Sequence, residues 1–228
     1  VRRGMQGTAV LGALASSAAA TSLLALGRDQ SAHGLAIAAN LGFGLKEALK
    51  TSSSQPVQVA RACEGGVLAA LAAGGNAEGT PTILEHGLLP LCGASGDLKA
   101  ITEGLGTRFS VAETYIKIHG GCRGNHAPID LVVRLLDEAD ADPGLIDTIS
   151  IAVDSVTAAA DIDHPVTGEQ AQFSARFAVA ARLLKGDALP HRYSPALLAD
   201  DGMSALMERI TACADKTPDA GSPDRRTT

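Results

Sequence analysis

The spacing of apolar residues over the first hundred positions predicts helices joined by short polar breaks. An apolar stretch from Thr8 to Leu26 predicts one helix, and Gly27 ends it. Apolar residues recur near helical spacing from Val59 to Leu71 and predict another helix after the polar loop 51–56. Thr80-Pro81 predicts the start of a short further helix, because proline fits a first turn, where its missing N–H has no helical partner.

The pattern changes after Gly87 into a mixture of strand and helix periods. Residues 88–108 are rich in glycine and predict a loop with a short helix. Phe109 to Ile118 is predicted as a strand, and so is Ile149 to Val153, where apolar and polar residues alternate. Helical spacing predicts three further helices, near residues 127–138, 173–184 and 203–210.

Together these elements predict a mainly α protein with two parts. An all-α domain is expected over residues 1–100, and a unit that mixes helices and strands, of the α+β class, over residues 101–214. The remaining tail, residues 215–228, is polar and contains proline and glycine, so it is expected to be disordered.

The first apolar stretch has the outline of a signal peptide or a membrane span, because Arg2-Arg3 precedes it. However, Gly12, Ser16 and Ser17 interrupt it, and it is poorer in large aliphatic residues than spans are. We therefore expect an internal, alanine-rich helix and no association with membranes. The chain begins with Val rather than Met, which favours a fragment of a longer protein.

Composition and charge narrow the class of protein. Hydrophobic residues make up 46% of the 228 residues and charged residues 19%, which excludes a disordered or collagen-like chain. The formal net charge of −6 argues against a general nucleic-acid binder, because such a protein needs a basic face toward phosphates. The 4 cysteines lie far apart with no CxxC pair, which favours free thiols and a cytosolic location.

The densest group of polar side chains lies between residues 115 and 130, where a predicted strand leads into a predicted helix. Arg123 and His126 stand near the N-terminus of that helix, which carries partial positive charge and attracts carboxylates. Together with Lys117 they could hold a polyanionic acid, and one of the three could move protons. The alternative is a solvated turn whose polar residues only cap the helix.

Two other chemistries are conceivable for the same stretch, a metal site and a thiol nucleophile. His119, Cys122 and His126 have spacing that suits a metal, but no further ligand completes a site, so no metal is expected. Cys122 and His126 could form a nucleophile pair, although nothing upstream marks the thiol as activated.

Four segments, in this order along the chain, carry a family resemblance. They are GMQGTA with LGA at 4–13, QPVQVARA at 55–62, the stretch from Lys117 to Asp130, and QAQFS with FAVAA at 170–181. They resemble the segments GFHPTAT-GA, KPLHAGRAA, K-x4-CR-x2-H-x3-D and EAQFSLPYAVAA of the MmgE/PrpD family, which includes 2-methylcitrate dehydratases and cis-aconitate decarboxylases. The similarity covers nearly the whole chain.

The resemblance implies a helical domain followed by an α+β lid domain, with the active site between them. It also implies a homodimer, no metal or organic cofactor, and a small carboxylic acid as substrate. The reaction it implies is dehydratase, decarboxylase or epimerase chemistry on a di- or tricarboxylate. Such chemistry needs a base for a proton alpha to a carboxylate and cations for the carboxylates and the developing charge.

Residue roles follow from the same resemblance. It assigns catalysis to Lys117 and His126, and it assigns substrate binding to Gln6, Thr8, Gln55, Arg123 and Phe177.

The chain departs from the family pattern at several of these positions. The family has His where this chain has Gln6 and Gln58, Lys at Gln55, and Tyr at Phe177. Because Gln and Phe exchange no proton near neutral pH, these side chains are expected to be neutral contacts. Three hypotheses follow: an active lyase, a catalytically degenerate relative, or an enzyme converted to a less anionic substrate.

Overall fold

A computed structural model describes residues 4–50, 54–93 and 99–215. The chain divides into two compact units, one ending at Glu113 and the other beginning at Thr114. The described residues are mainly helical with two short strands, which confirms the predicted fold class. Of the tail predicted to be disordered, residues 216–228 lie outside the described residues, while Asp215 donates its backbone N–H to Val153 O at 2.7 Å.

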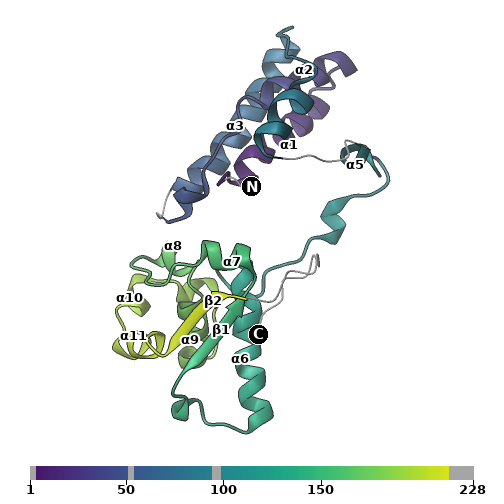
Figure 1. The fold of residues 1–228 in the computed structure, drawn as a ribbon. Helices are drawn as coiled ribbons and strands as arrows, with labels where there is room; N and C mark the ends of the chain where they lie inside the picture. The colour runs from purple at the N-terminus through teal and green to yellow at the C-terminus, as the bar shows by residue number, and fades with distance from the viewer. Residues whose placement is uncertain (1–3, 51–53, 94–98, 216–228) are drawn as a thin grey trace. The chain divides into compact units, whose positions relative to one another are not determined.

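Three helices that pack along their lengths form the first unit, called the helical unit below, and Figure 1 shows them side by side. They are α1 (Gly7–Leu23), α2 (Arg28–Ala38) and α3 (Ser54–Gly74). Shorter helical segments complete the unit: η1 (Lys46–Lys50), η2 (Leu84–Leu88), α4 (Leu89–Leu91), α5 (Lys99–Thr102) and η3 (Ser110–Glu113).

Small side chains allow these helices to approach closely. A Cβ on Gly66 of α3 would lie 2.4 Å from Ala13 O of α1, so only glycine fits there. The first apolar stretch forms the predicted alanine-rich helix, but only one face of it is buried: Ala9 and Ala13 are fully buried, whereas Leu11 and Leu23 are 59% and 88% exposed. Among the described helices, none combines the length and the apolar character that crossing a bilayer requires.

A two-stranded parallel sheet and the helices around it form the second unit. Strand β1 (Ile149–Val153) pairs with β2 (Ile210–Ala214) in parallel, with Ile149 opposite Ile210, and Figure 1 shows the two arrows together. The helices are α6 (His126–Ala139), α7 (Ser155–Ala160), α8 (Gly168–Ala171), α9 (Ala175–Lys185), α10 (Pro195–Leu198) and α11 (Asp201–Met207). Single turns lie at η4 (Arg123–Asn125), η5 (Pro143–Leu145) and η6 (Pro190–Arg192).

The core of the second unit lies where the sheet meets α9 and α11. Val153 of β1, Phe177 and Val179 of α9, Met203 of α11 and Ile210 of β2 are almost fully buried and pack in one cluster. The strand predicted at Ile149–Val153 is confirmed, because its alternating side chains reach this core.

Two predicted elements are wrong. Phe109 to Ile118 forms no strand: η3 occupies part of it, and residues 114–118 follow without regular structure. Ile116 and Ile118 are 93% and 73% exposed, so this apolar spacing lacks the partner strand that would bury it. Ile210 was predicted as part of the last helix, but α11 ends at Met207 and Ile210 begins β2.

Candidate functional site

The loop that precedes α6, residues 115–125, is held in place by close glycine contacts. A Cβ on Gly120 would lie 2.5 Å from Cε2 of Tyr193, and one on Gly124 would lie 2.2 Å from Oγ1 of Thr157. Gly121 has a φ of +74°, in the left-handed region that favours glycine. Glycine at these positions therefore allows the loop to pack directly against α7 and the segment around Tyr193.

Hydrogen bonds reinforce this packing. Cys122 N–H donates to Gln172 O at 2.6 Å, and Gly120 N–H donates to Ala188 O at 2.8 Å. The hydroxyl of Tyr193 donates to Gly120 O at 3.2 Å, and burial raises the pKa of that phenol, so it stays a donor. The loop is thus a fixed platform for the side chains it carries.

Two cationic side chains of the platform reach solvent. The ammonium of Lys117 donates to Gly121 O at 2.8 Å, and the guanidinium of Arg123 lies 4.9 Å from the ring centre of Tyr115. Both cations are exposed, so they can meet an anion from solution. The stacking on Tyr115 orients Arg123 without consuming its N–H donors.

His126 begins α6 and is almost completely buried. Its side chain is 7% exposed, and its Nε2 has no hydrogen-bond partner among the described residues. Burial is the largest cause that lowers the pKa of His126 to about 4, and the positive charges of Arg123, of Lys117 and, when it is protonated, of His119 contribute in the same direction. The imidazole is therefore neutral at pH 7, and it is a weak base.

Backbone carbonyls of the turn before α6 accept the N–H groups of Asn125 (Cys122 O, 3.0 Å) and His126 (Arg123 O), but no side chain among the described residues caps this helix. Asn125 stands at the N-cap position, yet its side chain makes no capping hydrogen bond within the described part of the chain. Its Nδ2 is buried and without a partner among those residues, and the first turn of this 14-residue helix holds no acidic residue. The positive end of the helix dipole is thus not neutralised by an adjacent carboxylate.

His119 and Asp130 form an ion pair at the same place. Nε2 of His119 lies 2.8 Å from Oδ1 of Asp130, and the His119 and His126 rings meet edge to face at 5.2 Å between centroids. Asp130 follows His126 by one helical turn, so both lie on the same face of α6. Sequence reasoning considered His119 only as a metal ligand and assigned no role to Asp130 or Asn125.

The structure therefore brings together three of the seven predicted site residues, Lys117, Arg123 and His126. Within the described ranges, no group of three or more His, Cys, Asp or Glu side chains is placed to hold a metal ion. The arrangement offers two cations and a helix N-terminus for carboxylates, beside imidazoles that could hold a proton.

Three predicted site residues belong to the helical unit. Gln6 is 9% exposed and stands at the N-cap of α1, where its Oε1 accepts the backbone N–H of Thr8 at 2.6 Å. Thr8 is exposed, and Gln55 is half-buried in the first turn of α3. Gln58, one turn further, donates from Nε2 to Leu45 O at 3.3 Å. The amide of Gln6 thus caps α1, and that of Gln58 bonds to the backbone of its own unit through Nε2, while its Oε1 is buried without a partner among the described residues.

Phe177 occupies a core position of the second unit. Its side chain has no exposed surface, and its ring lies 5.3 Å from that of Tyr193. Its role in this structure is packing between α9 and the segment that supports the loop. Its predicted contact with the substrate stays a prediction, because no part of the side chain reaches solvent in this structure.

Comparison with known proteins adds a family assignment. The family model described as the MmgE/PrpD N-terminal domain matches residues 2–97, and that of the MmgE/PrpD C-terminal domain matches residues 119–228. The chain is 26% identical over 227 residues to a protein of Aspergillus oryzae (strain ATCC 42149 / RIB 40) named cis-aconitate decarboxylase-like protein oryM. That alignment covers 92% of this chain and 47% of the relative, so the chain spans about half the length of that relative.

Proposed function

Because this chain belongs to the MmgE/PrpD family, we propose that it binds a small di- or tricarboxylate and performs lyase-type chemistry on it. The observation that supports this most directly is the meeting of two exposed cations, Lys117 and Arg123, with the uncapped N-terminus of α6. A substrate with two or more carboxylates matches such a set of donors.

Within this class we favour dehydration of a 2-methylcitrate-like acid. Dehydration removes a proton alpha to one carboxylate and expels the hydroxyl group of the neighbouring carbon as water. Lys117 would stabilise the negative charge that develops on the carboxylate, and Arg123 would hold a second carboxylate through paired N–H donors. His126, neutral at pH 7, would hold a proton or a hydroxyl at its unpartnered Nε2.

Decarboxylation of cis-aconitate is the second candidate, and the name of the Aspergillus relative favours it. Both reactions place negative charge beside a carboxylate, so both suit the same cations. Measuring the products separates them: dehydration yields an unsaturated acid and water, whereas decarboxylation yields carbon dioxide.

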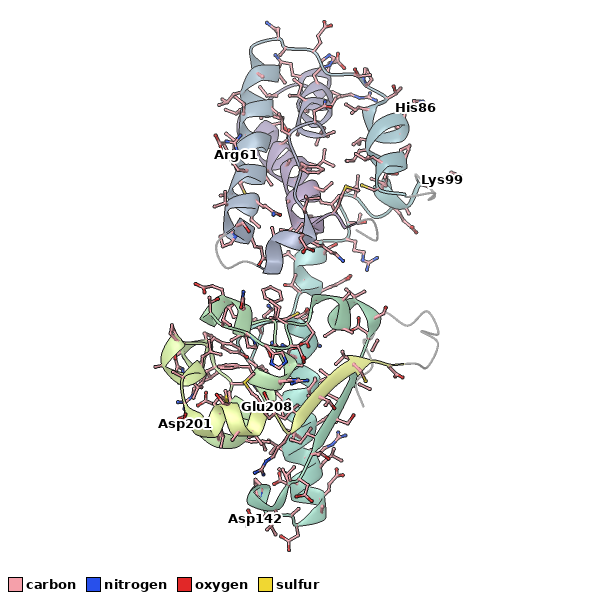
Figure 2. The ribbon with its side chains drawn as sticks, turned by 60° about the vertical axis from the view of Figure 1, so that its left-hand side comes forward. Arg61, His86, Lys99, Asp142, Asp201 and Glu208 are labelled. Atoms are coloured by element: carbon pink, nitrogen blue, oxygen red, sulfur yellow. The ribbon has the colours of Figure 1, made fainter. Side chains whose placement is uncertain are left out.

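Isothermal titration with citrate and cis-aconitate tests the binding step. Lys117→Ala and Arg123→Ala should each weaken binding by roughly 1.5–3 kcal/mol, the worth of a hydrogen bond to a charged group. Lys99→Ala and Arg61→Ala are matched controls, because both side chains are exposed in the helical unit, where Figure 2 labels them. Unchanged affinity in both loop variants would favour the capped, solvated turn instead.

Turnover tests the reaction itself. The full-length chain is incubated with 2-methylcitrate or cis-aconitate, and formation of unsaturated acid is followed by absorbance while carbon dioxide is measured in parallel. Binding without turnover of either acid would favour the degenerate relative among the three hypotheses.

Other expectations stay predictions. Neutral contacts from Gln6, Thr8 and Gln55 to the acid, a homodimer and a cytosolic location follow from the family resemblance and the cysteine pattern. Sedimentation of the purified chain tests the dimer, and a stable monomer would contradict it.

A further inference from the structure

The proposed chemistry needs a group that accepts a proton, and the assigned residues supply it poorly. His126 is held as a weak base by its burial, and Lys117 is a cation that already donates to Gly121 O. Gln6 and Gln58 cannot take a proton near neutral pH. None of these side chains is therefore a good proton acceptor.

Resting on the proposed function, we infer that His119 and Asp130 form the proton-transfer pair of this site. His119 accepts and returns the proton alpha to the carboxylate of the bound acid. Asp130 is a positioning residue, which orients the ring and faces the positive charge that His119 gains. Neither residue was assigned a role by the sequence or by the family resemblance.

The hydrogen bond between the two side chains fixes which nitrogen is available. An ionised carboxylate has only acceptor sites, so Nε2 of His119 must carry the hydrogen that it shares with Asp130 at 2.8 Å. Nδ1 of the neutral ring then keeps its lone pair and can accept a proton. A carboxylate that orients an imidazole and stabilises the imidazolium is a recurrent way to make histidine a general base.

The surroundings of the pair suit this role. The His119 side chain is 10% exposed and that of Asp130 is 67% exposed, so the pair stands at the surface of the platform. The His126 ring packs edge to face against His119 and limits its movement. Lys117 precedes His119 by two residues in the loop, and the charges of Lys117 and Arg123 lower the pKa of His126, whose ring contacts that of His119.

The chemical step is a reversible proton transfer. The C–H bond alpha to the carboxylate breaks, a bond forms between the proton and Nδ1 of His119, and the electron pair stays on the substrate as an enolate-like carboxylate. Lys117 and Arg123 face that added negative charge. Return of the proton restores the acid and the neutral imidazole, so no further reactant is required.

Exchange of citrate methylene protons for deuterium in D2O, followed by proton NMR, measures this step without requiring net turnover. The unaltered full-length chain should catalyse exchange. His119→Gln, which can still donate to Asp130, should slow exchange about 100-fold or more while citrate binding by calorimetry stays within about twofold. His86→Gln is the matched control, since His86 is exposed in the helical unit and labelled in Figure 2.

The positioning role of Asp130 is tested by measurements that the loss of a purely structural residue would not change. Asp130→Ala should lower the maximal exchange rate at least about tenfold without changing the citrate concentration at half-maximal rate. Nitrogen-15 spectra of labelled histidine should show His119 as the Nε2–H tautomer in the unaltered chain and as a mixture in Asp130→Ala. Asp137→Ala, two turns further along α6 and exposed, is the control.

The outcomes separate the two proposals. Loss of exchange with retained binding in His119→Gln supports the pair. If His119→Gln exchanges citrate protons as fast as the unaltered chain, the proton-transfer pair is overturned and the proposed function stands. If the unaltered chain binds citrate but catalyses no exchange, the pair is likewise overturned. Absence of citrate binding by the unaltered chain overturns the proposed function, and the pair with it.

Discussion

Gln6 and Asn125 occupy the same kind of place in the two units, the N-cap of a long helix, and they are used differently. In the helical unit, Gln6 accepts the N–H of Thr8 and so closes the end of α1. In the second unit, the Asn125 side chain makes no such bond to α6, and the next residue, His126, keeps a buried nitrogen without a partner among the described residues. The start of α1 therefore has a side-chain cap, whereas the start of α6 has none and keeps a buried amide and a buried imidazole nitrogen without partners among the described residues.

This difference separates polar residues that serve the fold from those that are available to a ligand. Gln58 Nε2 and Gln6 Oε1 bond to the backbone of their own unit, and neither residue carries charge, although Gln58 Oε1 is buried without a partner among the described residues. In the loop before α6, Lys117 and Arg123 are exposed cations on a backbone fixed by glycine contacts. Among the predicted site residues, all of which the structure describes, charge, exposure and a helix end without a side-chain cap coincide only in that loop.

The largest effect is expected from Gly124→Ala, which disrupts the close packing of the loop against α7. The added Cβ would lie 2.2 Å from Oγ1 of Thr157, closer than any real contact, so the loop or α7 must shift. We expect a loss of about 3 kcal/mol in the free energy of unfolding, together with weaker citrate binding. Chemical denaturation measures the first quantity and calorimetry the second.

Gly27→Ala provides the control in the helical unit. Nothing lies within 4 Å of a Cβ at Gly27, and this N-cap residue has an ordinary φ of −65°. Its free energy of unfolding should change by less than about 1 kcal/mol. Equal destabilisation by the two variants would show that the loop is no more tightly packed than an open N-cap.

The next effect is a pH dependence that comes from His126. Its pKa is about 4 in the folded chain and near 6.5 in the unfolded chain, so the unfolded state binds more protons between these values. Stability should therefore be complete above about pH 6.5 and fall by about 3 kcal/mol as the pH drops to 4. Denaturation across this range, compared with His126→Gln, isolates the contribution.

The variant His126→Gln should show a flatter profile between pH 6.5 and 4, because its amide does not titrate. His86→Gln, changed at an exposed histidine of the helical unit, should keep the slope of the unaltered chain. Identical slopes in all three proteins would mean that His126 is not held neutral by its burial.

The smallest effect is expected from Gln6→Ala, which removes the cap of α1. The lost hydrogen bond to Thr8 should cost about 1 kcal/mol and increase hydrogen exchange in the first turn of α1. Gln30→Ala on α2, whose side-chain hydrogen bonds are long at 3.4 Å, should cost less. A simultaneous fall in citrate affinity for Gln6→Ala would show that this amide also contacts the acid.

The sequence predicts correctly those elements in which the spacing of apolar side chains identifies the buried face. The amphipathic pattern of α6 and the alternation in β1 each identify a core-facing side, and both elements form where expected. Residues 109–118 have a strand-like pattern but no partner strand, and β2 is too short for its pattern to distinguish a strand from the end of a helix. Pairing depends on residues far away in sequence, which periodicity does not reveal.

The same limit applies to the candidate site. Lys117, Arg123 and His126 could be grouped from the sequence, because one short stretch carries them all and a helix begins there. The contact of His119 with Asp130 joins residues eleven positions apart and depends on the turn that residues 115–125 make before α6. No spacing rule predicts that contact. The burial that lowers the pKa of His126 comes from packing around α6 and was likewise not visible.

The most direct test of the contrast between the two units is to map citrate on the nitrogen-15-labelled chain by NMR. If the acid binds at the uncapped end of α6, the largest shifts should fall on the backbone amides of residues 121–126, and they should disappear in Arg123→Ala. Shifts concentrated on residues 4–9 and 55–62 of the helical unit, or no shifts at saturating citrate, would contradict a carboxylate site at this loop.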